Sequence, residues 1–172
     1  TTIHYNAGFL ANDLGRTEDA KRHFSALLDV EGYNKLNAYY FMIQILSTED
    51  KDPEAAYAMV TRAKEEYPSD KDLSTYEIQL LLQLNKMDEA MAQIKTALES
   101  DPNNTALLLR SGYLKEQAGD MEGALADYKK SVEVDPEFFE GNYYAAALLI
   151  EKAREVLNEL NNLSDEEWEK RS

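Results

Sequence analysis

The chain of 172 residues contains no cysteine, only seven glycines and only four prolines. The absence of cysteine excludes a disulfide framework, a thiolate metal site and a cysteine nucleophile. Little glycine and proline, with 44% hydrophobic and 30% charged residues, excludes a collagen-like or disordered chain and favours a helix-rich globular one. The longest apolar run, residues 143–150, is too short to cross a bilayer as a helix.

Basic residues are also scarce. The chain has 18 lysines and arginines against 33 acidic residues, which gives a net charge of -15, and the excess is spread over every segment. A nucleic-acid-binding protein normally carries a basic face, so nucleic acid and anionic membrane surfaces are poor candidates as ligands. The even spread is typical of a solvated surface, and it also leaves open a preference for basic ligands.

Patterns that carry chemistry are missing. The sequence holds no glycine-rich phosphate loop and no nucleophile elbow. Its two histidines, His4 and His23, are 19 residues apart without a spacing typical of metal ligands. Two adjacent acidic residues on a helix point in different directions. We therefore interpret such pairs as solvent-exposed charges and not as a general acid and base that act together. We therefore expect no catalytic site, no cofactor and no metal.

What the sequence does contain is a period of 34 residues. Pro68, Pro102 and Pro136 are each 34 residues apart, and each follows an amphipathic segment. A proline at such a place ends one helix and fixes the turn to the next, because it lacks the backbone N–H. Other positions share this phase: Ala56, Ala90 and Ala124, then Val60, Ile94 and Tyr128.

Each unit of the period contains two amphipathic segments separated by a short break. In residues 105–138 the break is Gly119-Asp120, and in residues 1–34 it is Gly15. Small residues such as Gly8 and Gly112 let the two helices of a unit approach closely. Such a pair cannot bury its own apolar face, so stacked neighbours must supply the core.

These residues resemble the tetratricopeptide repeat. The elements that carry the resemblance are Leu14-Gly15, Ala20 and Phe24 in the first unit, and Gly112, Gly119-Asp120, Ala124, Tyr128 and Asp135-Pro136 in the fourth. The resemblance implies an all-α, right-handed superhelical solenoid of antiparallel helix pairs. It also implies a non-enzymatic scaffold that binds other proteins. The chain is similar, more weakly, to multi-repeat proteins of Gram-negative bacteria.

We expect one domain over residues 1–172, with repeats at about 1–34, 37–70, 71–104 and 105–138. Two extra residues near Tyr33-Asn34-Lys35 lengthen the first junction. Residues 139–172 depart from the pattern and predict one helix to about Asn161, then a capping box at 164–167 that opens a short helix with Trp168. This segment is either a native cap or a truncated repeat.

The sequence alone does not determine the cellular compartment of the protein. The chain begins Thr1-Thr2-Ile3, without a basic or apolar signal stretch. The protein is therefore expected either in the cytoplasm or, with a removed leader, in the periplasm or outside the cell.

In this family the first helix of each unit lines a concave groove, where bound peptides lie. The resemblance therefore implies a binding surface that is aromatic, apolar and acidic. Its positions here are Tyr5, Phe9, Asn12, Asp13, Phe41, Ile45, Glu49, Thr75, Gln79, Leu82, Gln83, Leu109, Tyr113, Glu116, Gln117 and Tyr143. Alternatively, Tyr5, Phe9 and Tyr113 only pack between neighbouring first helices.

The residues of this surface also indicate the partner. Members of the family that bind chaperones grip a carboxylate with cationic side chains. The corresponding places here hold Phe41, Ile45, Tyr76 and Ala106, with only Arg110 cationic. A carboxylate is therefore disfavoured, and a protein or peptide segment with apolar anchors and basic residues fits better. The alternatives are self-association, such as a homodimer through residues 139–172, or a targeting arm of a larger protein.

Overall fold

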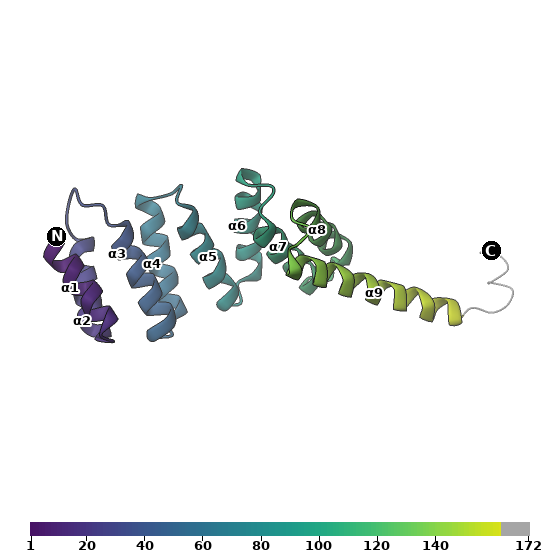
Figure 1. Cartoon of the computed structure of the whole chain (residues 1–172), viewed down its shortest axis with the longest axis horizontal. Helices are drawn as coiled ribbons and strands as arrows, with labels where there is room; N and C mark the ends of the chain where they lie inside the picture. The colour runs from purple at the N-terminus through teal and green to yellow at the C-terminus, as the bar shows by residue number, and fades with distance from the viewer. Residues whose placement is uncertain (163–172) are drawn as a thin grey trace. The chain divides into compact units, whose positions relative to one another are not determined.

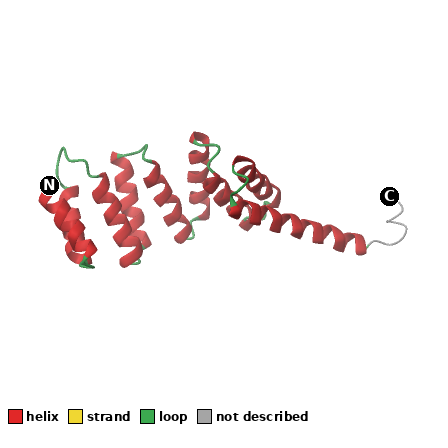
Figure 2. Ribbon diagram, viewed as in Figure 1, coloured by secondary structure: helices red, strands yellow, loops and turns green. Residues whose placement is uncertain are grey.

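The computed structural model describes residues 1–162, and within them the chain is all-α, with no strand (Figures 1 and 2). The predicted fold class is thereby confirmed. The elements are α1 (Thr2–Asp13), α2 (Thr17–Leu28), α3 (Leu36–Gln44), a π-helical turn η1 (Ile45–Glu49), α4 (Pro53–Glu66), α5 (Lys71–Gln83), α6 (Met87–Ser100), α7 (Thr105–Gln117), α8 (Met121–Val134) and α9 (Phe139–Asn161).

The connections between helices alternate in length. Three residues join α1 to α2, η1 to α4, α5 to α6 and α7 to α8. Four residues, carrying Pro68, Pro102 or Pro136, join α4 to α5, α6 to α7 and α8 to α9. The junction from α2 to α3 is longer, at residues 29–35, and Gly32 adopts a φ of 70° there. The sequence predicted both the short breaks and this longer junction.

Polar side chains close the beginnings of four helices. Asp52, Asp70, Asn104 and Asp120 each accept a hydrogen bond from the backbone N–H three residues further on, at 2.9 to 3.1 Å. Each such cap satisfies a backbone donor that the helix itself leaves unpaired and is worth about 1 kcal/mol. Pro53 occupies the first turn of α4, where its missing N–H costs nothing.

The chain forms two compact units, Thr1–Gln93 and Ile94–Ser172. In the first unit α1 to α5 pack in sequence (Figure 1) around fully buried side chains that include Phe24, Tyr39 and Ile43. In the second unit α7, α8 and α9 pack around Tyr128 and Leu148. Each unit therefore has its own core.

The 34-residue period appears directly in the burial of side chains. The residues at the repeated positions are all 0% exposed: Ala56, Ala90 and Ala124, then Val60, Ile94 and Tyr128. Small residues at the first position and larger ones at the second thus serve the same packing role in successive second helices.

A ring lies against a glycine in both units. The ring of Phe24 on α2 packs against Gly8 on α1, and the ring of Tyr128 on α8 packs against Gly112 on α7. In each pair the glycine and the aromatic residue are 16 positions apart. A Cβ atom at Gly8 would lie 2.9 Å from Phe24 Cε1, and one at Gly112 would overlap the Tyr128 ring. These glycines set how closely the two helices approach.

The long helix predicted after residue 138 is confirmed as α9, which ends at Asn161. It buries Gly141, Ala145 and Leu148 on one face. The predicted capping box at 164–167 and the helix with Trp168 lie outside the described residues. None of the helices in residues 1–162 combines the length and hydrophobicity that a membrane span needs.

The contact between Gly112 and Tyr128 can be tested by substitution. Gly112→Ala should lower the free energy of unfolding by about 1–3 kcal/mol, because the added methyl overlaps the tyrosine ring. This outweighs the gain of up to about 1 kcal/mol that alanine brings to a helix. Urea denaturation measures the change. In a Tyr128→Leu background the same substitution should cost less, and equal costs in both backgrounds would contradict the packing argument.

Candidate functional site

The predicted surface begins with aromatic residues on α1 and α3. The ring of Phe41 stacks on that of Phe24, with centroids 4.7 Å apart and planes 2° from parallel. The edges of Tyr5 and Phe9 meet Phe41 at 6.3 and 5.9 Å. Tyr5 and Phe9 on α1 therefore pack against Phe41 of the neighbouring first helix α3, which agrees with part of the alternative interpretation. Phe9 nevertheless keeps 45% of its surface exposed.

A hollow of about 350 Å³ lies between α3 and α5 in the first unit. Its lining residues are Tyr40, Asp72, Thr75, Tyr76 and Gln79. Thr75 and Gln79 belong to the predicted groove set, and both are exposed. The structure thus brings together two predicted residues from α5 with a tyrosine from α3.

Some polar groups around this hollow are already engaged. The Tyr40 hydroxyl donates to Asp70 Oδ1 at 2.7 Å, and the same oxygen caps α5 through the N–H of Leu73 at 2.9 Å. Burial, and then this hydrogen bond, raise the pKa of Tyr40 above its ordinary value, so the phenol stays protonated. The Thr75 hydroxyl donates to the carbonyl of Lys71 at 3.0 Å.

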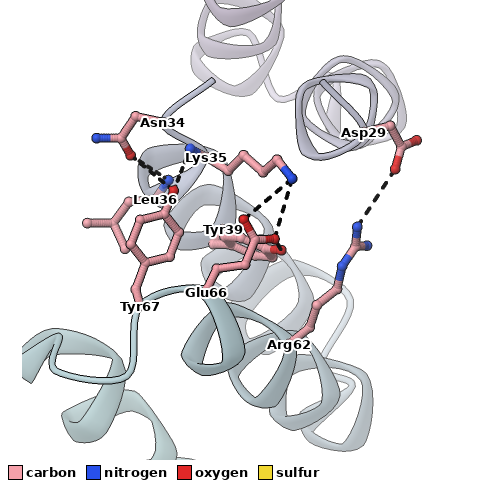
Figure 3. Close-up of polar contacts among 8 residues, drawn as sticks. All are labelled: Asp29, Asn34, Lys35, Leu36, Tyr39, Arg62, Glu66 and Tyr67. Atoms are coloured by element: carbon pink, nitrogen blue, oxygen red, sulfur yellow. Dashed lines mark hydrogen bonds and ion pairs between the residues drawn. The ribbon is translucent and has the colours of Figure 1, made fainter. Parts of the chain in front are cut away.

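The position of α3 depends on a polar network around Tyr39 (Figure 3). The Tyr39 hydroxyl donates to Glu66 at 2.7 Å, and the Lys35 ammonium lies 3.4 Å from the same carboxylate. The backbone N–H of Lys35 donates to the hydroxyl of Tyr67 at 2.9 Å. These bonds tie the beginning of α3 to the end of α4, so they hold the helix that carries Tyr40 and Phe41.

The same network shifts two pKa values in opposite directions. Burial, and then the hydrogen bond to Glu66, raise the pKa of Tyr39 to about 12, because both favour the neutral phenol. The hydrogen bond from Tyr39 lowers the pKa of Glu66, since it stabilises the carboxylate. The pair is therefore held as a neutral donor and a charged acceptor at neutral pH.

Ile45 requires a correction to the predicted surface. It is 1% exposed and belongs to the core of the first unit, so it offers no surface to a partner. The sequence placed it four residues after Phe41 on the assumption of regular α-helix. The spacing itself is helical, because α3 is regular up to Gln44 and the π-helical turn η1 begins only at Ile45. Ile45 is buried because it packs into the core of the first unit. Glu49, at the end of η1, is exposed.

The predicted residues of the second unit lie in different environments. Tyr113 and Tyr143 are 44% and 59% exposed, and Tyr143 stacks beside Phe139 at 6.4 Å. Leu109 packs against the core of the unit. Glu116 accepts a hydrogen bond from the Tyr128 hydroxyl at 2.8 Å, so its carboxylate supports the fold.

The remaining predicted positions are polar or partly covered. Asn12 and Leu82 are half-buried, whereas Asp13, Gln83 and Gln117 are exposed. None of these five side chains is drawn into the hollow between α3 and α5.

Sequence reasoning missed several residues that the structure brings together. Tyr40 and Asp72 line the hollow but were not in the groove set. A signal was present, because Asp72 and Tyr76 are four residues apart and so share one face of a helix with Thr75 and Gln79. The histidines were also missed as a pair: His4 Nδ1 lies 3.1 Å from His23 Nδ1, across α1 and α2.

The described residues contain no group of three or more histidine, aspartate or glutamate side chains that could hold a metal ion. The polar groups of the surface are single carboxylates, amides and hydroxyls on the first helices. Their arrangement supports recognition by hydrogen bonds, charge and aromatic contact.

Two models of the tetratricopeptide repeat family match the sequence, one over residues 47–110 and the other over residues 105–138. Together they span residues 47–138, which is more than half of the 172 residues. The chain therefore belongs to the tetratricopeptide repeat family, as its proline and glycine spacing indicated. Proteins of this family generally serve as non-enzymatic protein-interaction modules.

Solved structures with a similar fold include two structures of MamA and one of YrrB. The segment of MamA from position 41 to its end, from Desulfovibrio magneticus RS-1, is 16% identical, with a TM-score of 0.73 over 88% of this chain and 85% of that one. MamA of AMB-1 is 17% identical, with a TM-score of 0.68 over 96% and 94%. YrrB, described as a TPR protein with an unusual peptide-binding site, is 22% identical, with a TM-score of 0.67 over 83% and 72%. At these identities the likeness shows the fold alone.

The raised pKa of Tyr39 predicts how stability changes in alkali. The folded state favours the phenol, so its contribution is fully present below pH 10 and is lost as the pH rises from 10 to 12. The intact chain should therefore lose on the order of 2 kcal/mol more than Tyr39→Phe over this range. Denaturation of both proteins at several pH values measures the difference. A constant difference would contradict the assignment.

Proposed function

We propose that the protein is a non-catalytic scaffold that binds a segment of a partner protein along its first helices. Its family supports protein or peptide partners in general. The finer proposal concerns the surface of α1, α3 and α5 in the first unit. Tyr113 and Tyr143, in the second unit, stay separate predictions. The division into four repeats stays a prediction.

The observation that carries this proposal is the hollow between α3 and α5. Its lining comes from first helices, which are the elements expected to face a bound segment. Phe9, exposed beside Phe41 on α1 and α3, supplies an aromatic anchor in the same unit. Aromatic anchors beside polar groups are common at the centres of protein interfaces.

The exposure of Phe9 decides which aromatic residue is useful in a test. Phe41 stacks on the buried ring of Phe24, so its removal would disturb the core. Phe9 touches Phe41 only along an edge and leaves almost half of its surface free. It can therefore contribute both to packing and to binding, and only a measurement of both separates the two interpretations.

A double variant tests binding along the first helices. Phe9→Ala with Gln79→Lys removes the anchor and places a charge at the hollow. It should reduce affinity for a partner by at least about tenfold, since each change removes on the order of 1 kcal/mol. A partner is first captured from a lysate, then purified, and its dissociation constant is measured by calorimetry.

A matched control places equivalent changes on second helices. Val134→Ala removes a side chain that is 40% exposed, and Thr61→Lys adds a lysine to the exposed side of α4. This control should bind as the intact chain does. Equal loss in both variants, or a loss that follows the unfolding temperature, would overturn the proposal.

A second candidate function is self-association through α9. Its exposed side carries apolar residues at alternating spacings of four and three, which is the pattern of a helix that packs along another helix. The residues of this seam are Phe139, Tyr143, Ala146, Ile150, Ala153, Leu157 and Leu160. The seam lies opposite Gly141, Ala145 and Leu148, which are buried within the unit.

The partner proposed for this seam is α9 of a second copy in antiparallel orientation. At the centre of such a pair the residues are complementary to themselves about a two-fold axis, because large side chains there meet small ones. Tyr143 would lie against Ala153 of the second copy, and Ile150 against Ala146. Ile150 and Leu157 are 60% and 58% exposed without such a partner.

One charge in the seam tests self-association. Ile150→Glu should raise the dissociation constant of the dimer by at least about tenfold, because a buried unpaired carboxylate is costly. Asn158→Glu adds the same charge at an exposed position outside the seam and should leave it unchanged. Sedimentation equilibrium measures both. A chain that stays monomeric at all concentrations, or equal effects of the two changes, would exclude this candidate.

A further inference from the structure

The hollow between α3 and α5 has the chemistry of a site for one cationic side chain. None of its five lining side chains is cationic, and one of them, Asp72, is a carboxylate. Within residues 1–162 no hydrogen bond or ion pair engages Asp72. Its charge is therefore available to a ligand.

Two aromatic rings stand beside this carboxylate. The rings of Tyr40 and Tyr76 have centroids 6.0 Å apart, with planes tilted by 41°. A ring face attracts a cation within about 6 Å of its centroid, by about 0.5 to 2 kcal/mol depending on desolvation. The hydrogen bond from Tyr40 to Asp70 restrains the first ring, and both tyrosines line the hollow.

The other polar groups can complete the recognition of a planar donor group. Gln79, which carries an amide, and Tyr76, which carries a hydroxyl, both line the hollow. A guanidinium group has five N–H donors in one plane, can pair with a carboxylate through two bonds and can stack on aromatic rings. A lysine ammonium is a compact, strongly hydrated charge that does not stack in this way.

We propose that this hollow binds an arginine side chain of the partner segment. The Asp72 carboxylate pairs with the guanidinium, the neighbouring rings of Tyr40 and Tyr76 offer it an aromatic surface on one side, and Gln79 accepts a further N–H. This inference rests on the proposed function, because it names a residue type that the partner brings to the surface of the first helices. The net charge of -15 favours the approach of a basic segment over long distances.

The general acidity of the chain demands a control for diffuse attraction. Asp72 is the second residue of α5, and Asp88 is the second residue of α6. Both are exposed, and both carry the same charge in the first turn of a helix. Asp72→Asn and Asp88→Asn therefore change net charge and helix-dipole energy alike, and only the first alters the hollow.

The test uses short peptides and the full chain. The probe is acetyl-Ala-Arg-Ala-amide, titrated into isotope-labelled protein and followed by NMR shifts of backbone amides in α3 and α5. The two comparison peptides carry lysine or the uncharged isostere citrulline in place of arginine. We expect saturable shifts around Tyr40 and Tyr76 with the arginine peptide, and binding at least about fivefold weaker with lysine.

The variants give the decisive comparison. Asp72→Asn should weaken binding of the arginine peptide by at least about fivefold, whereas Asp88→Asn should leave it within about twofold. Tyr76→Leu should weaken it as well, because the aromatic face is lost. Equal effects of the two asparagine variants, equal binding of the citrulline or lysine peptide, or shifts spread over the whole surface would overturn the inference.

Its failure is distinguishable from failure of the proposed function. The peptide titration needs no partner protein. A partner that binds through Phe9 and Gln79 while the arginine peptide shows no site would refute only the inference. An arginine site in a chain whose partner ignores the first helices would refute only the proposed function.

Discussion

The close approach of two helices within a pair is the constraint on which the rest of the structure depends. Where a ring of the second helix lies against a glycine of the first, as Tyr128 lies against Gly112, the two helices of the pair pack closely together. The apolar side chains left on its outer faces then need neighbours, which the next pair provides. Each helix pair must present the same faces to the next pair. The same residue types therefore recur every 34 residues in the sequence.

Much of the fold could be predicted because it depends on local signals that repeat. Pro68, Pro102 and Pro136 mark the turns between pairs, and alanines at one phase mark the buried side of the second helices. The end of α9 at Asn161 was also predictable, since no glycine or proline interrupts residues 142–161. The π-helical turn at Ile45 was not. No residue type specifies it, and its first residue, Ile45, lies in the packed core of the first unit.

The candidate site was only partly predictable for a related reason. Positions carried over from the family identify the side of each helix, and two of the positions predicted in this way, Thr75 and Gln79, line the hollow. They do not reveal what a side chain does once it is there. Glu116 is bonded to Tyr128, and Ile45 is enclosed by the core, although both share the predicted side. Whether a side chain is buried, hydrogen-bonded or exposed depends on residues distant in the sequence, and a repeat pattern does not specify these contacts.

The contacts of individual carboxylates show that several of the acidic residues support the fold. Asp70 caps a helix and accepts from Tyr40, while Glu66 and Glu116 each accept from a buried tyrosine. These acids hold neutral phenols in place, so their charges belong to the fold. Asp72 has no such bond, although it stands beside two aromatic rings at a hollow. A carboxylate that no hydrogen bond or ion pair engages, at a surface where a partner segment is proposed to bind, is the feature on which the proposed specificity for arginine rests.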